Sequence, residues 1–170
     1  KNDGNLLPLA DGKKVLVVGE NAIKMMTVGG GSSSLKVQHE IIPLDGLKAA
    51  AAKHGLTVDY ARGYVGDTGG EYNGVVTGQD LNDNRTPEQL IAEAVDKAKN
   101  ADYVIFVGGL NKANHQDAED SDREGLGLPY GQDAVIEALA AANPNTIVVN
   151  ISGNAVAMPW ADKVPAILQA

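Results

Sequence analysis

The chain has 170 residues, of which 44% are hydrophobic, so it is long enough to build one domain with a sizeable core. Its 22 acidic residues against 14 basic ones give a formal charge of −8, which argues against a nucleic-acid or anionic-membrane surface. The absence of cysteine excludes disulfides and thiolate metal sites. No apolar run approaches the length of a membrane span, and Lys1-Asn2-Asp3-Gly4 resembles neither a signal peptide nor a translation start. We therefore expect the chain to be a piece of a longer protein.

Five segments have the composition of β-strands. Three of them, Val15 to Gly19, Tyr103 to Gly109 and Thr146 to Ile151, are continuous apolar runs typical of strands buried on both faces of a parallel sheet. Thr57 to Gly63 alternates in polarity and predicts a weaker strand, and Ala166 to Leu168 predicts a further one.

Helical patterns fall between these strands. The first runs from Pro43 to His54, with Gly55 at the position of a helix stop. The second begins at Thr86, an N-cap residue followed by proline, and the third runs from Asp133 to Ala142. This alternation predicts a three-layer α/β/α domain with a mainly parallel, flavodoxin-like central sheet. The segment from Gly66 to Arg85 is polar and glycine-rich and shows no usable period.

A glycine-rich loop follows the first predicted strand. Gly19-Glu20-Asn21-Ala22 and then Gly29 to Ser34 could cradle a phosphate with backbone N–H groups. Against this, no Gly-x-Gly-x-x-Gly leaves the strand and Glu20 would repel an anion. A turn-rich loop without a ligand is the alternative.

The most informative segment is acidic and follows the strand predicted at Tyr103 to Gly109. It reads Glu119-Asp120-Ser121-Asp122-Arg123, and loops at the carboxyl ends of parallel strands are where α/β folds bind ligands. Glycoside hydrolysis needs two carboxyl groups, one of them a proton donor. Neighbouring carboxylates would raise the pKa of Glu119 and Arg123 would lower it, so the sequence leaves the protonation state of Glu119 open. The alternative is a solvated loop with an internal salt bridge.

The order and spacing of several motifs, running nearly end to end, resemble the C-terminal domain of family 3 glycoside hydrolases, the β-glucosidases and their relatives. The acidic segment carries this resemblance together with three others: Lys1 to Leu9, Leu126 to Gln132, and Gly153 to Trp160.

In family members similar to this chain the acidic segment reads Glu-Gly-x-Asp-Arg, and its glutamate supplies the proton. The resemblance therefore implies that Glu119 is the general acid/base. Asp120 departs from the usual glycine and Ser121 from the usual aromatic residue, so Asp117 or Asp120 remains an alternative acid.

The other site residues are also implied by the resemblance. Asp122 and Arg123 are expected to fix the loop that carries the acid, and Asn111, His115 and Asp120 are expected to contact sugar. No metal or cofactor is expected, because His39 and His54 have no spacing that completes a metal site with His115. Trp160 is expected in the core, and Ser152-Gly153-Asn154 does not fit a nucleophile elbow.

The family resemblance implies a retaining β-glycosidase acting on a β-glucoside or oligosaccharide. Its aspartate nucleophile would lie in a preceding (β/α)8-type barrel domain, absent from residues 1–170, and a secreted or periplasmic location would follow from the family. The competing hypothesis is a non-catalytic Rossmann- or flavodoxin-like module that binds a nucleotide or a protein. A third is an interaction domain without any site.

Overall fold

The computed structural model describes residues 1–26, 35, 37–66, 71–72, 75–113, 115–118 and 122–170. Its centre is a five-stranded parallel sheet in the order β2-β1-β5-β6-β7. The strands are β1 (Lys14–Val18), β2 (Thr57–Ala61), β5 (Tyr103–Gly109), β6 (Thr146–Ile151) and β7 (Ala166–Gln169). This is the flavodoxin-like order, and the predicted parallel sheet is confirmed.

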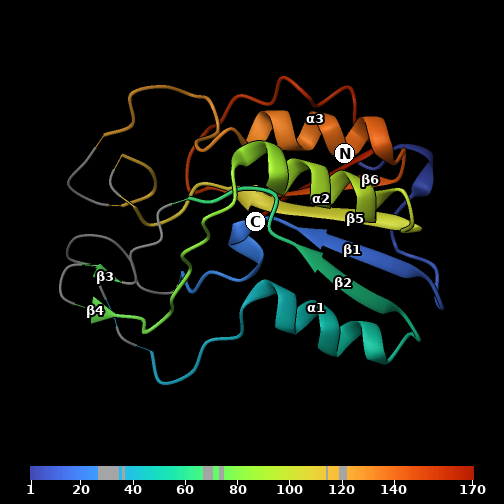
Figure 1. Cartoon of the computed structure of the whole chain (residues 1–170), viewed down its shortest axis with the longest axis horizontal. Coiled ribbons are helices and arrows are strands. Elements are labelled where there is room, and N and C mark those ends of the chain that lie inside the picture. The colour runs from blue at the N-terminus through green and yellow to red at the C-terminus, as the bar shows by residue number, and fades with distance from the viewer. Residues whose placement is uncertain (27–34, 36, 67–70, 73–74, 114, 119–121) are drawn as a thin grey trace.

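The three helices lie on opposite faces of the sheet and make the outer two layers (Figure 1). One face carries α2 (Pro87–Ala98) and α3 (Gln132–Ala142), and its core includes Phe106 and the fully buried Trp160. The other face carries α1 (Pro43–Ala52) and the apolar residues of the N-terminal segment. The expected core position of Trp160 is confirmed. The continuous apolar runs of β1 and β5 follow from this arrangement, because both faces of these strands are covered.

The helix ends follow local chemistry. The side chain of Thr86 accepts a hydrogen bond from the N–H of Gln89, and the Gln89 side chain accepts one from the N–H of Thr86, which completes a capping box. The first helix ends at Ala52, two residues before the predicted end at His54, and Gly55 follows with a φ of +64°.

The segment from Gly66 to Arg85 contains two strands that the sequence did not predict. They are β3 (Glu71–Tyr72) and β4 (Val75–Val76), which pair in antiparallel register. Strands of two residues are too short to produce a recognisable alternation. The described residues also form two short 3-10 helices, η1 (Asp3–Asn5) and η2 (Glu20–Ala22).

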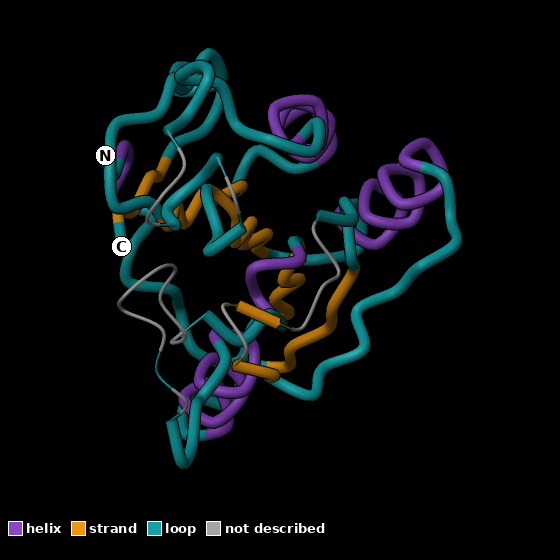
Figure 2. Tube along the Cα trace, turned by 90° about the vertical axis from the view of Figure 1, so that its left-hand side faces the viewer, coloured by secondary structure: helices purple, strands orange, loops and turns teal. Residues whose placement is uncertain are grey.

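The two chain ends lie side by side, as Figure 2 shows. The N–H of Ile167 donates to the carbonyl of Lys1, the Lys1 amino group donates to the carbonyl of Ile167, and Asn2 forms an antiparallel bridge with Ala166. The first residues of the chain thereby extend the β7 edge of the sheet.

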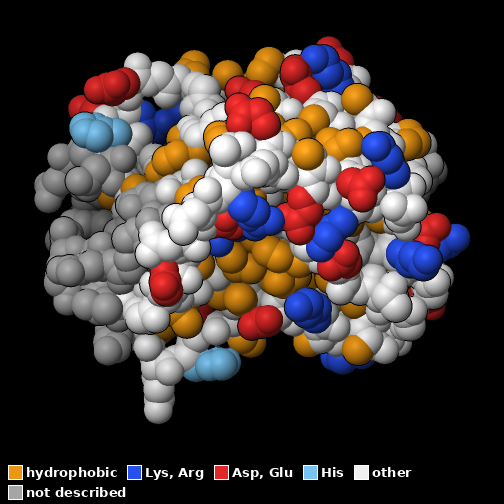
Figure 3. Space-filling view, viewed as in Figure 1, with side chains coloured by type: hydrophobic (Ala, Val, Ile, Leu, Met, Phe, Trp, Pro, Cys, Tyr) orange, Lys and Arg blue, Asp and Glu red, His pale blue; other side chains and the backbone are white. Residues whose placement is uncertain are grey.

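Among the described helices, none is long and apolar enough to cross a membrane. On the face seen in Figure 3, basic and acidic side chains are interspersed, and apolar side chains gather near its centre. The described part of this face therefore carries no continuous basic patch of the kind that binds a polyanion.

Candidate functional site at the carboxyl edge of the sheet

The loops that leave β5 and β6 lie next to each other because the two strands pair up to Gly109 and Ile151. Gly109 has a φ of +113°, and a Cβ added to it would lie 2.1 Å from the carbonyl oxygen of Ile151. Only glycine fits this position. The N–H of Leu110 then donates to the same carbonyl at 2.8 Å, which holds the start of the β5 loop against β6.

Asn111 and Gln116 shape the first part of the β5 loop. Asn111 is 3% exposed, and its Oδ1 accepts a hydrogen bond from the N–H of Ala113 at 2.7 Å. The Oε1 of Gln116 accepts from the N–H of Asn111 at 2.9 Å, and its Nε2 donates to the hydroxyl of Tyr130 at 2.6 Å. Asn111 therefore has a structural role in the loop, and the predicted sugar contact from this residue stays a prediction.

Asp117 joins the β5 loop to the β6 loop. Its Oδ2 accepts from the N–H of Gly153 at 2.7 Å, and its Oδ1 accepts from Nδ2 of Asn154 at 2.9 Å. Its own N–H donates to the carbonyl of Asn111. Both carboxylate oxygens are thus used to attach the loop.

Arg123 attaches the other end of the acidic segment to the same β6 loop. Its Nη1 donates to Oδ1 of Asn154 at 2.5 Å and to the carbonyl of Ala155 at 2.6 Å. Among the described ion pairs none joins Arg123 to Asp122, which is exposed. Among the described residues Arg123 is thus held by the β6 loop, and a salt bridge from Arg123 to Glu119 or Asp120 lies outside the described residues.

His115 is exposed, with a φ of +60°, and its Nδ1 lies 2.9 Å from the carbonyl oxygen of Asp122. This contact links the beginning and the end of the segment from 115 to 122. Glu119 and Asp120 lie outside the described residues, so the roles predicted for them, and the sugar contact predicted for His115, stay predictions.

A cleft of about 680 Å³ lies beside these attachment points. Its lining includes Gln116, Ala118, Asp122, Arg123, Asn154 and Ala155. The lining is therefore drawn from both loops that Asp117 and Arg123 connect.

A buried charge cluster lies at the carboxyl ends of β1 and β2. Glu20 is fully buried, and its Oε2 accepts from Nη2 of Arg62 at 2.8 Å and from the N–H of Gly66 at 2.6 Å. Lys24 Nζ lies 3.9 Å from its Oε1. Burial, followed by the charge of Glu20, raises the pKa of the nearby Tyr64 hydroxyl.

The buried charge cluster around Glu20 argues against phosphate binding by the loop after β1. Glu20 follows β1 after a single residue, Gly19, where a phosphate loop would place backbone donors. Its carboxylate instead accepts a hydrogen bond from the N–H of Gly66. The described part of the loop therefore holds an internal anion. Gly29 to Ser34 lie outside the described residues.

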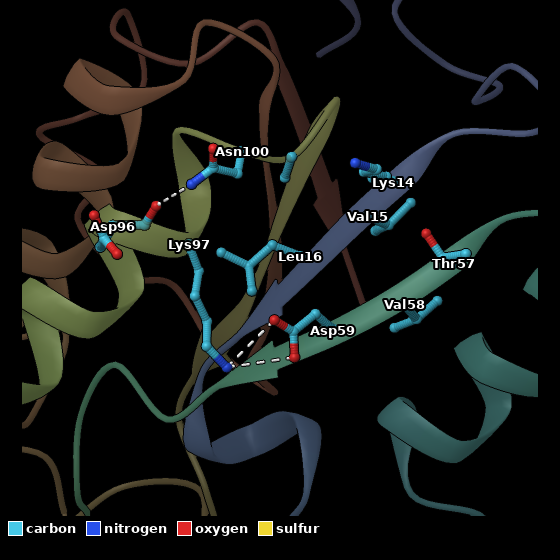
Figure 4. Close-up of a pocket in the computed structure, with 10 residues that line it drawn as sticks. Lys14, Val15, Leu16, Thr57, Val58, Asp59, Asp96, Lys97 and Asn100 are labelled. Carbon is cyan, nitrogen blue, oxygen red and sulfur yellow. Dashed lines mark hydrogen bonds and ion pairs between the residues drawn. The ribbon is translucent and has the colours of Figure 1, made fainter.

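A separate cavity of about 420 Å³ lies between α2 and the β2 edge of the sheet (Figure 4). Two of its charged groups, Lys97 and Asp59, pair with each other: Lys97 Nζ contacts both carboxylate oxygens of Asp59 and donates to the carbonyl of Tyr60 at 2.7 Å. Asn100 donates to the carbonyl of Asp96. The cavity is lined by the first residues of β1 and β2, at the opposite end of the strands from the loops described above.

Within the described ranges, no cluster of three or more His, Cys, Asp or Glu side chains could hold a metal ion.

Sequence reasoning missed two residues of this edge, Gln116 and Asn154. Both are neutral amides whose role depends on partners in other parts of the fold, and a single sequence contains no signal for such contacts.

Comparison with known proteins supports the interpretation of the motifs. The chain is 47% identical over 171 residues to a β-glucosidase of Bacteroides ovatus, covering 99% of this chain and 22% of that protein. It is 34% identical over 179 residues to an exo-α-(1→6)-L-arabinopyranosidase of Bifidobacterium longum, covering 99% and 21%. The chain thus spans about a fifth of the length of these curated relatives.

Solved structures agree with this result. A family 3 β-glucosidase from Bifidobacterium adolescentis superposes with a TM-score of 0.74 at 34% identity, covering 98% of this chain and 22% of that one. A Kluyveromyces marxianus β-glucosidase reaches a TM-score of 0.83 at 19% identity, covering 99% and 35%, which supports the fold alone. The family model for the glycosyl hydrolase family 3 C-terminal domain matches residues 1–170. The chain therefore belongs to the family of glycosyl hydrolase family 3 C-terminal domains.

Proposed function

We propose that this domain supplies the general acid/base of a retaining β-glucosidase, and that the acid is Glu119. The nucleophile would lie in a barrel domain that precedes this one in a longer protein. A β-glucoside or a β-linked oligosaccharide would bind between the two domains, against the cleft beside the β5 and β6 loops.

The observation that carries the proposal is the double attachment of the segment around Glu119. Asp117 on one side and Arg123 on the other both bind the β6 loop at Gly153 to Ala155. A proton donor must be held in a fixed position relative to the glycosidic oxygen, and short segments attached at both ends provide this. The relatives at 47% and 34% identity are a β-glucosidase and an arabinopyranosidase, which agrees with this chemistry.

Asp117 is a weaker candidate for the acid than the sequence implied. Its two oxygens already accept hydrogen bonds from Gly153 and Asn154, so protonating it would break an attachment of the loop. This favours Glu119 over Asp117 and leaves Asp120 as the alternative acid within the segment.

The test is a leaving-group series on the full-length protein. Glu119→Ala is expected to lower kcat/KM by about 10²-fold or more for poor leaving groups and far less for activated aryl β-glucosides, because only the former need the proton. Azide should partly rescue the activated substrate and give a glycosyl azide, because it needs no general base. Glu137→Gln, a change at a partly exposed position on α3 away from both loops, is the control. If Glu119→Ala behaves as wild type while Asp120→Ala or Asp117→Ala shows this signature, the assignment of Glu119 is wrong.

A further inference from the structure

The side chain of Asn154 contacts both ends of the segment that contains Glu119. Its Nδ2 donates to Asp117 at 2.9 Å, and its Oδ1 accepts from Arg123 at 2.5 Å. These two partners lie 37 and 31 residues away in the chain, and one planar amide connects them.

The contacts leave one orientation for this amide. Asp117 offers only acceptors and Arg123 offers only donors, so the nitrogen must face the first and the oxygen the second. Of the side chains of this length, only asparagine carries a donor and an acceptor in this arrangement. Aspartate at 154 would place two carboxylates against each other, and leucine would serve neither partner.

Few hydrogen bonds attach the Arg123 side chain to the β6 loop. Its Nη2 is buried and has no hydrogen-bond partner among the described residues, so its described hydrogen bonds all come from Nη1, to Asn154 and the carbonyl of Ala155. Loss of the Asn154 amide would leave one bond at each end of the segment, from Gly153 to Asp117 and from Arg123 to Ala155.

We propose that Asn154 is a positioning residue for the acid/base segment and that it acts through Asp117 and Arg123. The inference rests on the proposed function, because it assumes that the segment between these two residues delivers the proton. Asn154 would then affect proton donation without contacting the glycosidic oxygen.

The structure offers an exchange of side chains as the test. Asn154→Asp alone places the new carboxylate against that of Asp117, so two acceptors face each other. Asp117→Asn alone also mismatches: its new NH2 group faces either the NH2 group of Asn154 or the N–H of Gly153, so two donors face each other. The double variant, Asp117→Asn with Asn154→Asp, restores every bond. The amide now at position 117 accepts from the N–H of Gly153 and donates to the carboxylate now at position 154, whose other oxygen accepts from Arg123. The net charge is unchanged.

The full-length protein is assayed with aryl β-glucosides of poor and good leaving groups. Each single variant is expected to lower kcat/KM about tenfold for poor leaving groups and about twofold for activated ones. The double variant should return to within about threefold of wild type. Asn100→Ala, which removes an exposed asparagine side chain far from the loops, should leave both values unchanged.

Two results would overturn the proposal: single variants with the wild-type dependence on leaving group, or a double variant no better than the singles. Amide hydrogen exchange at Gly153, whose N–H donates to Asp117, reports the attachment independently of catalysis in wild type, the two singles and the double variant. If Glu119→Ala shows no dependence on leaving group, the proposed function fails. The exchange data then decide separately whether Asn154 holds the segment, since protection at Gly153 should be reduced in the singles and regained in the double variant.

Discussion

The Gln132 side chain forms two hydrogen bonds with the backbone of Gly109. Its Oε1 accepts from the Gly109 N–H at 2.8 Å, and its Nε2 donates to the Gly109 carbonyl at 2.8 Å. Gln132 is fully buried at the start of α3, so it fixes the last residue of β5 relative to that helix. The loop that carries the proposed acid begins at this clamp.

Removal of the Gln132 clamp is expected to destabilise the domain. In Gln132→Ala the N–H and C=O of Gly109 would both stay buried without these partners, and the free energy of unfolding should fall by about 2–4 kcal/mol. Urea unfolding followed by circular dichroism measures this. Gln89→Ala, an exposed glutamine in the capping box of α2, is the control and should lose only about 0.5–1 kcal/mol. Equal losses in the two variants would contradict the role of the clamp.

The buried pair of Glu20 and Arg62 gives a second prediction. Glu20→Gln removes the carboxylate that is ion-paired with Arg62, so this buried guanidinium loses its hydrogen-bonded anion. We expect a loss of about 3–5 kcal/mol in the free energy of unfolding, the range found for breaking buried pairs. Glu93→Gln, which removes a half-exposed partner of Arg85 and Lys97, should change the value by less than about 1 kcal/mol. A small effect of Glu20→Gln would show that the cluster does not need its anion.

The pair of Asp83 and Arg85 predicts a pH dependence. Hydrogen bonds from Arg85 lower the pKa of the Asp83 carboxyl to about 2. Because the folded-state pKa lies below the unfolded one, the pair stabilises the fold above about pH 4, and this contribution is lost as the pH falls towards 2. Arg85 is 43% exposed, so the effect is at most about 1 kcal/mol.

Urea midpoints at pH 7 and pH 2 test this dependence. Asp83→Asn should be less stable than wild type at pH 7, and the difference should have largely disappeared at pH 2. Asp162→Asn, at a carboxylate without an ion pair among the described residues, is the control. A difference that persists unchanged at pH 2 would assign the effect to something other than charge.

The 170-residue domain by itself is expected not to hydrolyse aryl β-glucosides. Retaining hydrolysis requires a nucleophile and an acid/base on opposite sides of the bond, and we propose that this chain carries only the second. The assay compares the purified domain with the full-length protein at equal concentration. Turnover by the domain that disappears in Glu119→Gln would show that it has its own nucleophile.

The sequence by itself determined the layers and the strand directions. The runs Val15 to Gly19 and Tyr103 to Gly109 are apolar at every position before their glycines, which happens when both faces of a strand are covered. The Thr86-Pro87 pair placed the start of α2 correctly, because capping is decided by neighbouring residues. The order of the motifs also indicated the family that the comparison confirmed.

The tertiary structure alone decided which polar side chains meet. Glu20 follows a strand in a glycine-rich context typical of an exposed loop, yet it is fully buried because Arg62 reaches it from 42 residues away. Asn154 lies in the Gly153 to Trp160 motif, but that motif does not indicate its partners; its contacts with Asp117 and Arg123 exist because β5 and β6 are neighbours in the sheet. Periodicity and capping report on a residue's nearest neighbours in the chain. Hydrogen-bond partners at the edge of a parallel sheet are set by strand order and register, which bring together loops that are far apart in the sequence.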